Sequence, residues 1–231
     1  MDEQRNGRRT RGRRGLRWVL VGLAACLVGA TVALLVAPTI IRAVYPGRLL
    51  GGEDLTHQDT SVHWVWRSGK ELGWMMGVIP HIRRVYVKEV AAGNGCIHVR
   101  GGAPGCIFGT STRHVATLDV ETGREVGRGP AGRKAEYINL EWDGHRWTGN
   151  WAGLTWTISD RGRELRVGHA ERPGDASVRL LALAGDAQLG ASLYGLRFGD
   201  GTLVLATFEG YVLCTDLGAV EQALGPLDAR P

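Results

Sequence analysis

Residues 136–159, EYINLEWDGHRWTGNWAGLTWTIS, alternate apolar and polar side chains in three short runs. A period of two residues is typical of strands that bury one face. The pairs Asp143-Gly144 and Ala152-Gly153 separate the runs, and both favour two-residue hairpin turns. We therefore predict a three-stranded antiparallel meander. Its expected cross-strand neighbours are Trp147 with Ile158, Trp151 with Leu154, and Trp156 with Gly149.

The tryptophans of this stretch fall on its inferred apolar faces: Trp142, Trp147, Trp151 and Trp156. We expect them to pack in the core rather than to line a carbohydrate or peptide surface. Trp64, which alternates with Trp66 beside His63, is less constrained by this pattern. It is our candidate for an exposed surface contact.

A second meander of the same form lies near the C-terminus, with strands expected at 193–198, 202–208 and 211–216. Past residue 60, no segment has a sustained apolar period of 3.6 residues. Short alternating runs bounded by glycine, aspartate and asparagine predominate instead. These observations favour an all-β domain.

A short motif recurs between the predicted strands. Its near copies start 54 and then 39 residues apart, and they are Gly69-Lys70-Glu71-Leu72-Gly73, Gly123-Arg124-Glu125-Val126-Gly127 and Gly162-Arg163-Glu164-Leu165. Periods of about 40–55 residues with four short strands each are typical of propeller blades.

The stretches 118–126 (LDVETGREV) and 65–72 (VWRSGKEL) resemble the blade motif of quinoprotein-type (PQQ-like) β-propellers. The resemblance covers roughly residues 62–225 and implies the fold without a cofactor. This length supplies three or four propeller-like blades, fewer than a closed wheel of the family usually has. The adjacent cysteine pair of the cofactor-binding enzymes is also absent. A four-bladed wheel, an incomplete propeller and a β-sandwich therefore remain alternatives.

The N-terminal region predicts a membrane anchor. Residues 18–41 contain no charged side chain. As a helix they extend about 36 Å, enough to cross a hydrocarbon core of about 30 Å. We divide the chain into a cytoplasmic Arg-rich tail (1–17), a transmembrane helix (18–41), a linker (42–60) and an extracytoplasmic β-domain (61–231).

The charge distribution orients this anchor. Residues 1–17 hold seven arginines and two acidic residues, whereas the rest of the chain carries 21 basic and 21 acidic side chains. An arginine cluster beside a span is the positive-inside signal and attracts anionic lipid headgroups. We expect a single-pass protein of a bacterial inner or plasma membrane, with its C-terminal domain outside. The balanced remainder argues against nucleic-acid binding, because it has no basic excess to displace counterions.

Other interpretations of the apolar run are weaker. It is longer than the apolar core of a cleaved signal peptide. The stretch Leu23-Ala24-Ala25-Cys26 resembles a lipoprotein signal, but cleavage there would leave Leu27–Ile41 without a role. Small residues recur every four positions at Ala25, Gly29 and Ala33, and such a stripe lets helices approach closely. Ordinary span composition explains this stripe, and helix association through it is the alternative hypothesis.

The cysteines outside the span are Cys96, Cys106 and Cys214. The segment between Cys96 and Cys106 contains Gly101-Gly102-Ala103-Pro104-Gly105, which we expect to turn sharply and bring two strand ends together. We predict a Cys96–Cys106 disulfide, as an oxidising compartment allows. The alternative is two free thiols. Cys214 lies mid-strand and is expected to be a small core residue.

Candidate chemical groups are sparse. His57, Asp59, His63 and His98 could suggest a metal, but their spacing fits no common site. Ser111 and His114 near Asp119 could suggest a triad, yet the chain has no G-x-S-x-G elbow. It also has no glycine-rich phosphate loop. We therefore assign no catalytic, metal or cofactor residue.

Two functions remain. The first is a membrane-anchored extracytoplasmic binding or scaffold module, part of an envelope protein complex. The alternative is an extracytoplasmic enzyme or cofactor protein of unknown reaction. A flat apolar patch or an open edge strand favours the first, whereas a deep pocket with perturbed titratable groups favours the second.

Overall fold

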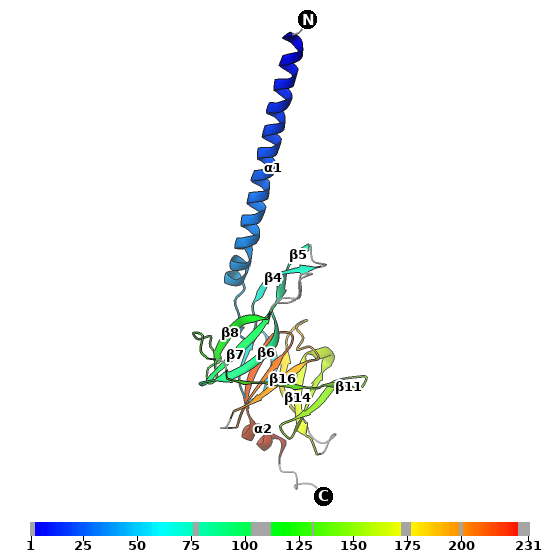
Figure 1. Cartoon of the computed structure of the whole chain (residues 1–231). Helices are drawn as coiled ribbons and strands as arrows, with labels where there is room; N and C mark the ends of the chain where they lie inside the picture. Colours follow the sequence, from blue (N-terminus) through cyan, green and yellow to red (C-terminus); the bar gives the residue numbers. More distant parts are fainter. Residues whose placement is uncertain are drawn as a thin grey trace. The chain divides into compact units, whose positions relative to one another are not determined.

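The computed structural model describes residues 3–75, 79–102, 112–130, 132–171, 177–198 and 201–225 (Figure 1). The chain divides into two units, Met1–Val44 and Tyr45–Pro231. The first is a single helix and the second is built mainly from strands. This confirms the predicted combination of one N-terminal helix and an all-β domain.

The N-terminal unit is helix α1, Glu3–Val44. Its segment Trp18–Val44 is long and apolar enough to cross a membrane, which extends the predicted span by three residues. Ala25, Gly29 and Ala33 lie on its exposed surface. A methyl group added at Gly29 would meet no atom within 4 Å. The stripe of small residues is therefore accessible, and helix association through it stays a hypothesis.

Two six-stranded antiparallel sheets contain most of the second unit. Sheet A has the order β1 (Arg48–Leu49), β3 (Val62–Arg67), β18 (Tyr211–Asp216), β17 (Thr202–Thr207), β16 (Leu193–Arg197) and β10 (Glu136–Ile138). Sheet B has the order β11 (Glu141–Trp142), β12 (Trp147–Trp151), β13 (Leu154–Ser159), β14 (Glu164–His169), β15 (Val178–Leu183) and β2 (Leu55–Gln58).

Two smaller sheets complete the strands. Sheet D has the order β8 (Arg113–Asp119), β7 (Cys96–Gly102), β6 (Tyr86–Gly93) and β9 (Arg133–Lys134). Sheet C is the hairpin of β4 (Lys70–Met75) and β5 (Ile79–Arg84). A 3₁₀ turn, Asp160–Gly162, joins β13 to β14, and helix α2, Leu217–Leu224, follows β18.

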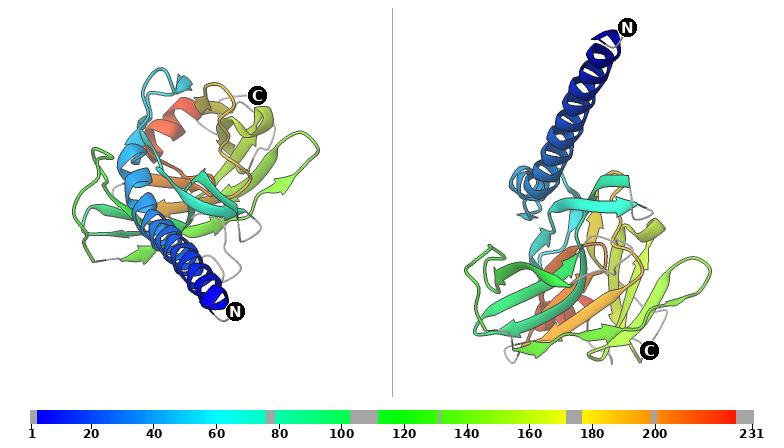
Figure 2. Two further views of the ribbon diagram at one scale, coloured as in Figure 1. Left: turned by 90° about the horizontal axis from the view of Figure 1, so that it is seen from above. Right: turned by 45° about the horizontal axis from the view of Figure 1, so that its top comes forward.

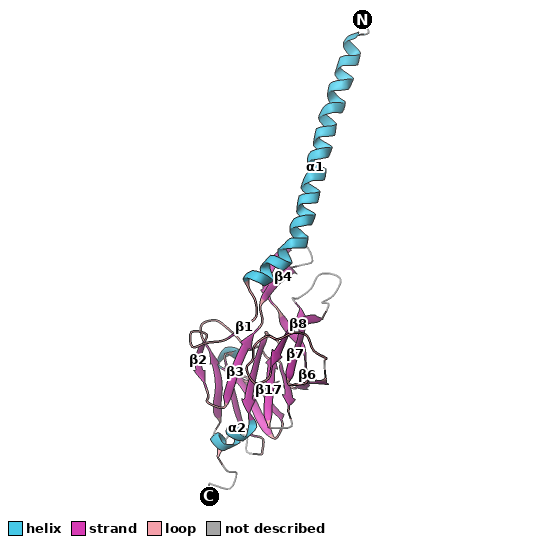
Figure 3. Cartoon of the chain, turned by 90° about the vertical axis from the view of Figure 1, so that its left-hand side faces the viewer, coloured by secondary structure: helices cyan, strands magenta, loops and turns pink. Residues whose placement is uncertain are grey.

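Sheet A is buried on both faces. In β17, Leu203 and Leu205 enter a core shared with sheet B, whereas Val204 and Ala206 enter a core shared with sheet D. A strand covered on both sides needs a continuous apolar run, and β17 has one. Figure 2 shows the resulting layers, with the orange strands of sheet A between the green strands of sheet D and the yellow-green strands of sheet B. In Figure 3, β3 and β17 of sheet A lie between β2 of sheet B and β6, β7 and β8 of sheet D. Among the described residues these sheets form no closed ring.

The predicted registers of the first meander are confirmed. Trp147 pairs with Ile158, Gly149 with Trp156, and Trp151 with Leu154. The C-terminal meander is also present as β16, β17 and β18. The prediction of one strand over 136–142 is wrong, because the chain passes from sheet A to sheet B within it. Leu140, between β10 and β11, is buried in the core between these two sheets.

The predicted linker, residues 42–60, is more ordered than expected. Helix α1 continues to Val44, β1 pairs with β3, and β2 pairs with β15. Strands β1 and β2 are therefore edge strands of sheets A and B. Both residues of β1 are exposed and those of β2 alternate in burial, so neither gives an apolar run from which a strand could be predicted.

The turn between β11 and β12 makes a pH-dependent contribution. Asp143 accepts hydrogen bonds of 2.9 Å from the backbone N–H groups of His145 and Arg146 and from Arg146 Nε. These bonds lower the pKa of Asp143 to about 2. Because the unfolded value is about 3.9, the stabilisation is present above that pH and is lost as the pH falls through 2.

We expect the carboxyl chemical shift of Asp143 to titrate with a midpoint near pH 2. The variant Arg146→Ala should raise this midpoint only in part, because both backbone donors, the largest causes of the shift, remain. A wild-type midpoint of about 3.9 would mean that the turn is not formed in solution.

Candidate functional site

The segment 136–142, which we call the edge segment, runs along the exposed ends of two sheets. Its first part, β10, is the last strand of sheet A, and its last part, β11, is the last strand of sheet B. Among the described strands, β10 pairs only with β16 and β11 only with β12. Edge strands with free backbone groups are sites where another chain can add a strand.

Two large aromatic side chains are exposed on the edge segment. Tyr137 is 57% exposed and Trp142 is 53% exposed. The Tyr137 ring lies 5.5 Å from that of Tyr194, and the Trp142 ring lies 5.2 Å from that of Trp147. Contacts of this kind hold exposed rings in place, which lowers the entropy lost when a partner binds.

Buried side chains fix the position of the backbone of the edge segment. Ile138 and Leu140 are buried in the core between sheets A and B. At the start of the segment, Trp151 Nε1 donates a 3.0 Å hydrogen bond to Glu136 Oε2. This bond, together with a second from Arg133, lowers the pKa of Glu136. The arrangement presents aromatic side chains from a fixed backbone.

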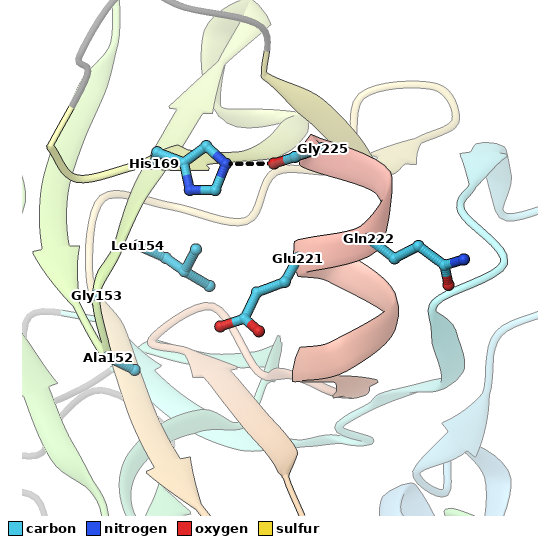
Figure 4. Close-up of a pocket in the computed structure, with 7 residues that line it drawn as sticks. All are labelled: Ala152, Gly153, Leu154, His169, Glu221, Gln222 and Gly225. Atoms are coloured by element: carbon cyan, nitrogen blue, oxygen red, sulfur yellow. Dashed lines mark hydrogen bonds between the residues drawn. The ribbon is translucent and has the colours of Figure 1, made fainter. Parts of the chain in front are cut away.

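The second candidate is a pocket beside helix α2 (Figure 4). It has a volume of about 480 Å³ and opens between the β12–β13 turn, the end of β14 and the helix. Its lining residues are Ala152, Gly153, Leu154, His169, Glu221, Gln222 and Gly225. His169 Nε2 lies 3.1 Å from the carbonyl oxygen of Gly225, so the imidazole links β14 to the C-terminal end of the helix.

Turn and helix-capping residues in the sequence account for the walls of this pocket. Ala152 and Gly153 have φ values of 56° and 78°, which places the tight turn predicted from their sequence at its rim. Asp216 caps helix α2 by accepting a 2.6 Å hydrogen bond from the N–H of Ala219. Gly225, with φ 78°, ends the helix, and its N–H donates to the carbonyl of Glu221. Helix capping and turn formation therefore account for the walls.

The groups whose pKa is displaced lie away from this pocket. Hydrogen bonds from Thr122 lower the pKa of Asp119, and burial raises the pKa of Tyr211 and Glu209. These groups belong to a turn and to packed strands. Paired titratable groups at one position are what acid–base chemistry needs. The pocket therefore supports the enzyme alternative less than the edge segment supports the binding module.

The predicted exposure of Trp64 is wrong. Trp64 is only 6% exposed and lies in the core between sheets A and D, where its Nε1 donates a 2.9 Å hydrogen bond to the carbonyl of Val120. Strand β3 is internal to sheet A, and it contributes Val65 to the core with sheet B and Trp64 to the core with sheet D. Trp142 shows the opposite error: it was predicted to be buried but lies at a sheet edge. A position at the edge of a sheet is not visible in a period of two residues.

The predicted disulfide is not found. Cys96 is a free thiol, and Cys106 lies outside the described residues. Strand β7 runs without a turn from Cys96 to Gly102, with Cys96 opposite Asp119 in β8. This strand spans about 20 Å, so Cys96 and Gly102 lie at opposite ends of β7. Cys214 is buried, as predicted.

The candidate metal and triad residues have separate contacts. His57 bonds the carbonyl of Arg179, and Asp59 bonds Ser61. His63 is exposed. The described residues contain no group of three or more ligand side chains placed for a metal.

His98 and His114 both approach the Thr117 hydroxyl, at 3.4 and 3.5 Å. Burial lowers the pKa of His114, with Arg128 adding to the effect. Asp119 accepts from Thr122 rather than from either histidine, and Ser111 lies outside the described residues. The three residues of the suggested triad are therefore not shown to be connected.

Comparison with protein-family models, with curated proteins and with solved structures gives no match. The function must therefore be argued from the geometry of the chain itself.

Proposed function

We propose that this protein is a membrane-anchored binding or scaffold module of an envelope protein complex. Helix α1 anchors it in a bacterial inner or plasma membrane, with the arginine-rich N-terminus in the cytoplasm. The β-domain lies outside and binds a partner protein through the edge segment, residues 136–142.

The open, aromatic edge carries this proposal. Trp and Tyr are the residue types that contribute most often to the centre of protein interfaces. Here they lie on two edge strands whose outer backbone groups have no described strand beside them. A partner that adds a strand to β10 or β11 would also bury Tyr137 or Trp142. Backbone pairing and aromatic burial would then act together.

The sequence of the first unit supports this location. A helix that is apolar from Trp18 to Val44 favours a bilayer over water, because its side chains are exposed along its length. Seven arginines before it favour retention of that end in the cytoplasm. The neutral charge balance of the rest of the chain is compatible with transfer across the membrane.

The resemblance to propeller repeats suggests how the sheets of the β-domain are arranged. Sheets A, B and D are antiparallel, and two hydrophobic cores join their faces. Sheet A combines β3 from the start of the domain with β16, β17 and β18 from its end. We take these sheets as propeller-type blades in an incomplete wheel. The open edges would then be completed by the partner.

Site-specific crosslinking in native membranes tests the binding proposal. A photoreactive amino acid at position 137 or 142 should give a discrete protein adduct. The same residue at the exposed position Arg124 is the matched control, because it lies in the connection after β8. The expected adduct forms at the edge segment and not at the control.

A substitution at the proposed interface is a second test. With the photoreactive residue at 137, Trp142→Ser should reduce the adduct at least about fivefold, since loss of an interface tryptophan typically costs more than 1 kcal/mol. Equal adducts from all positions, or none at 137 and 142, would contradict a partner at this edge. Sedimentation of the protein with membranes after alkaline carbonate extraction checks the anchor separately.

A further inference from the structure

The pocket beside helix α2 presents polar groups of one electrostatic character (Figure 4). Its volume of about 480 Å³ falls in the range of sites that bind small molecules. Its described lining residues include one carboxylate, Glu221, and one imidazole, His169, but no lysine or arginine. A ligand in this pocket therefore meets a negative charge that no lysine or arginine of the described lining balances.

The hydrogen bond of His169 determines which group its imidazole presents to the pocket. A carbonyl oxygen only accepts hydrogen bonds, so the 3.1 Å contact with the carbonyl of Gly225 requires the proton on Nε2 of His169. In the neutral imidazole, Nδ1 then carries no proton and is an acceptor. Figure 4 shows this second ring nitrogen on the side of the ring that faces Leu154 and Glu221. His169 therefore offers an acceptor to a ligand in the pocket.

The carboxylate of Glu221 is open to a ligand. Its side chain is exposed, and Figure 4 shows it extending from the helix toward Leu154, whereas the side chain of Gln222 points away. Within the part of the chain that the structure describes, no hydrogen bond or ion pair engages this carboxylate. The buried side chain of Leu154 gives the pocket an apolar surface between the two acceptors. The site therefore combines a negative group with an apolar wall.

Helix α2 adds to the negative potential of the pocket. Its C-cap residue, Gly225, is part of the lining, so the C-terminal end of the helix lies at the site. The aligned peptide dipoles of a helix place a partial negative charge at this end. The last turn of α2 contains no basic residue that would compensate it. The carboxylate, the imidazole acceptor and the helix end therefore all favour a positively charged group.

We propose that this pocket binds a small organic cation, a primary ammonium group on a short apolar chain. The ammonium group donates hydrogen bonds to the Glu221 carboxylate and to Nδ1 of His169, and the apolar chain packs against Leu154. Charge-assisted hydrogen bonds of this kind are stronger than those between neutral groups. The site goes beyond the proposed function, because none of its residues belongs to the edge segment, and it is independent of the membrane anchor.

Photoaffinity labelling of the full chain in detergent tests the proposal. The probe is n-pentylamine that carries a diazirine on its chain, and the adducts are located by mass spectrometry of peptides. We expect adducts in the peptides that contain Leu154 and Glu221. Excess unlabelled n-pentylamine should remove these adducts, because it has the same ammonium group. Excess n-pentanol, which has the same chain without the charge, should leave them nearly unchanged.

Removal of the carboxylate charge is a second measurement. Glu221→Gln should weaken the affinity for the probe about tenfold, because a hydrogen bond to a charged group contributes more than one to a neutral group. Glu221 is exposed and lies outside both hydrophobic cores, so this isosteric change leaves the fold intact. Glu53→Gln, which removes an exposed carboxylate outside the pocket, is the matched control and should leave the affinity unchanged.

Several outcomes would overturn the cation site. Adducts spread over exposed carboxylates along the chain, without enrichment at the pocket, would mean that the probe pairs with any acidic residue. Equal competition by n-pentanol would mean that the pocket selects the apolar chain and not the charge. An affinity that Glu221→Gln does not change would exclude the proposed ion pair. Trp142→Ser, the variant used for the edge segment, should leave the adducts unchanged, and their loss would place the probe at that edge instead.

Discussion

Trp156→Ala is expected to lower the free energy of unfolding by about 3–5 kcal/mol, the usual cost of removing a buried tryptophan. Trp156 is fully buried in the core between sheets A and B. It is the cross-strand partner of Gly149, and its Nε1 donates a 3.0 Å hydrogen bond to the carbonyl of Trp151. The substitution leaves a cavity in this core and removes the hydrogen bond to Trp151.

The measurement is thermal unfolding of the full chain in detergent, followed by near-ultraviolet circular dichroism. A loss of this size should lower the Tm by roughly 10 °C for a domain of this length. Trp142→Ala is the matched control, because it removes the same side chain from an exposed position. We expect less than about 1 kcal/mol there. Equal losses in the two variants would mean that the core is not organised as described.

Gly210→Ala is expected to have an effect of similar size through the backbone. Gly210, in the turn between β17 and β18, has φ 92°. An added methyl group would collide with Ser68 Oγ and lie 2.7 Å from the Val85 carbonyl oxygen. A left-handed conformation costs a residue with a Cβ about 1–2 kcal/mol, and overpacking adds about 1–3 kcal/mol.

Gly51→Ala is the control for this substitution. A methyl group at Gly51 would meet no atom within 4 Å, and its φ lies outside the left-handed region. Urea unfolding of both variants should show a lower midpoint for Gly210→Ala alone. An unchanged midpoint for Gly210→Ala would contradict the close packing of this turn against Ser68.

Local patterns predicted the strands well where both partners are close in sequence. The register of β12 with β13, and the positions of the strands β16, β17 and β18, followed from alternation and from the short glycine turns between them. The buried position of Cys214 followed in the same way. Hairpins of this kind need only the period of two residues and a turn that tolerates positive φ.

The candidate edge was only partly predictable. Its aromatic residues were visible in the sequence, but Trp142 was assigned to the core and Trp64 to the surface, the reverse of what the structure shows. Alternation tells which side chains share a face, and it does not tell which strands end a sheet. Trp64 lies on an internal strand covered by sheet D, whereas Trp142 lies on the last strand of sheet B.

The apolar helix, the charge asymmetry around it and the β character of the remaining domain can all be derived from the amino-acid sequence. These properties depend on composition and on periods of a few residues, so no distant contact is needed to produce them. The pairing of β3 with the C-terminal strands and the change of sheets at Leu140 became visible in the folded chain. The same is true of the hydrogen bond from Lys70 to Tyr45. Such contacts join residues far apart in the chain, and they depend on which faces become buried together.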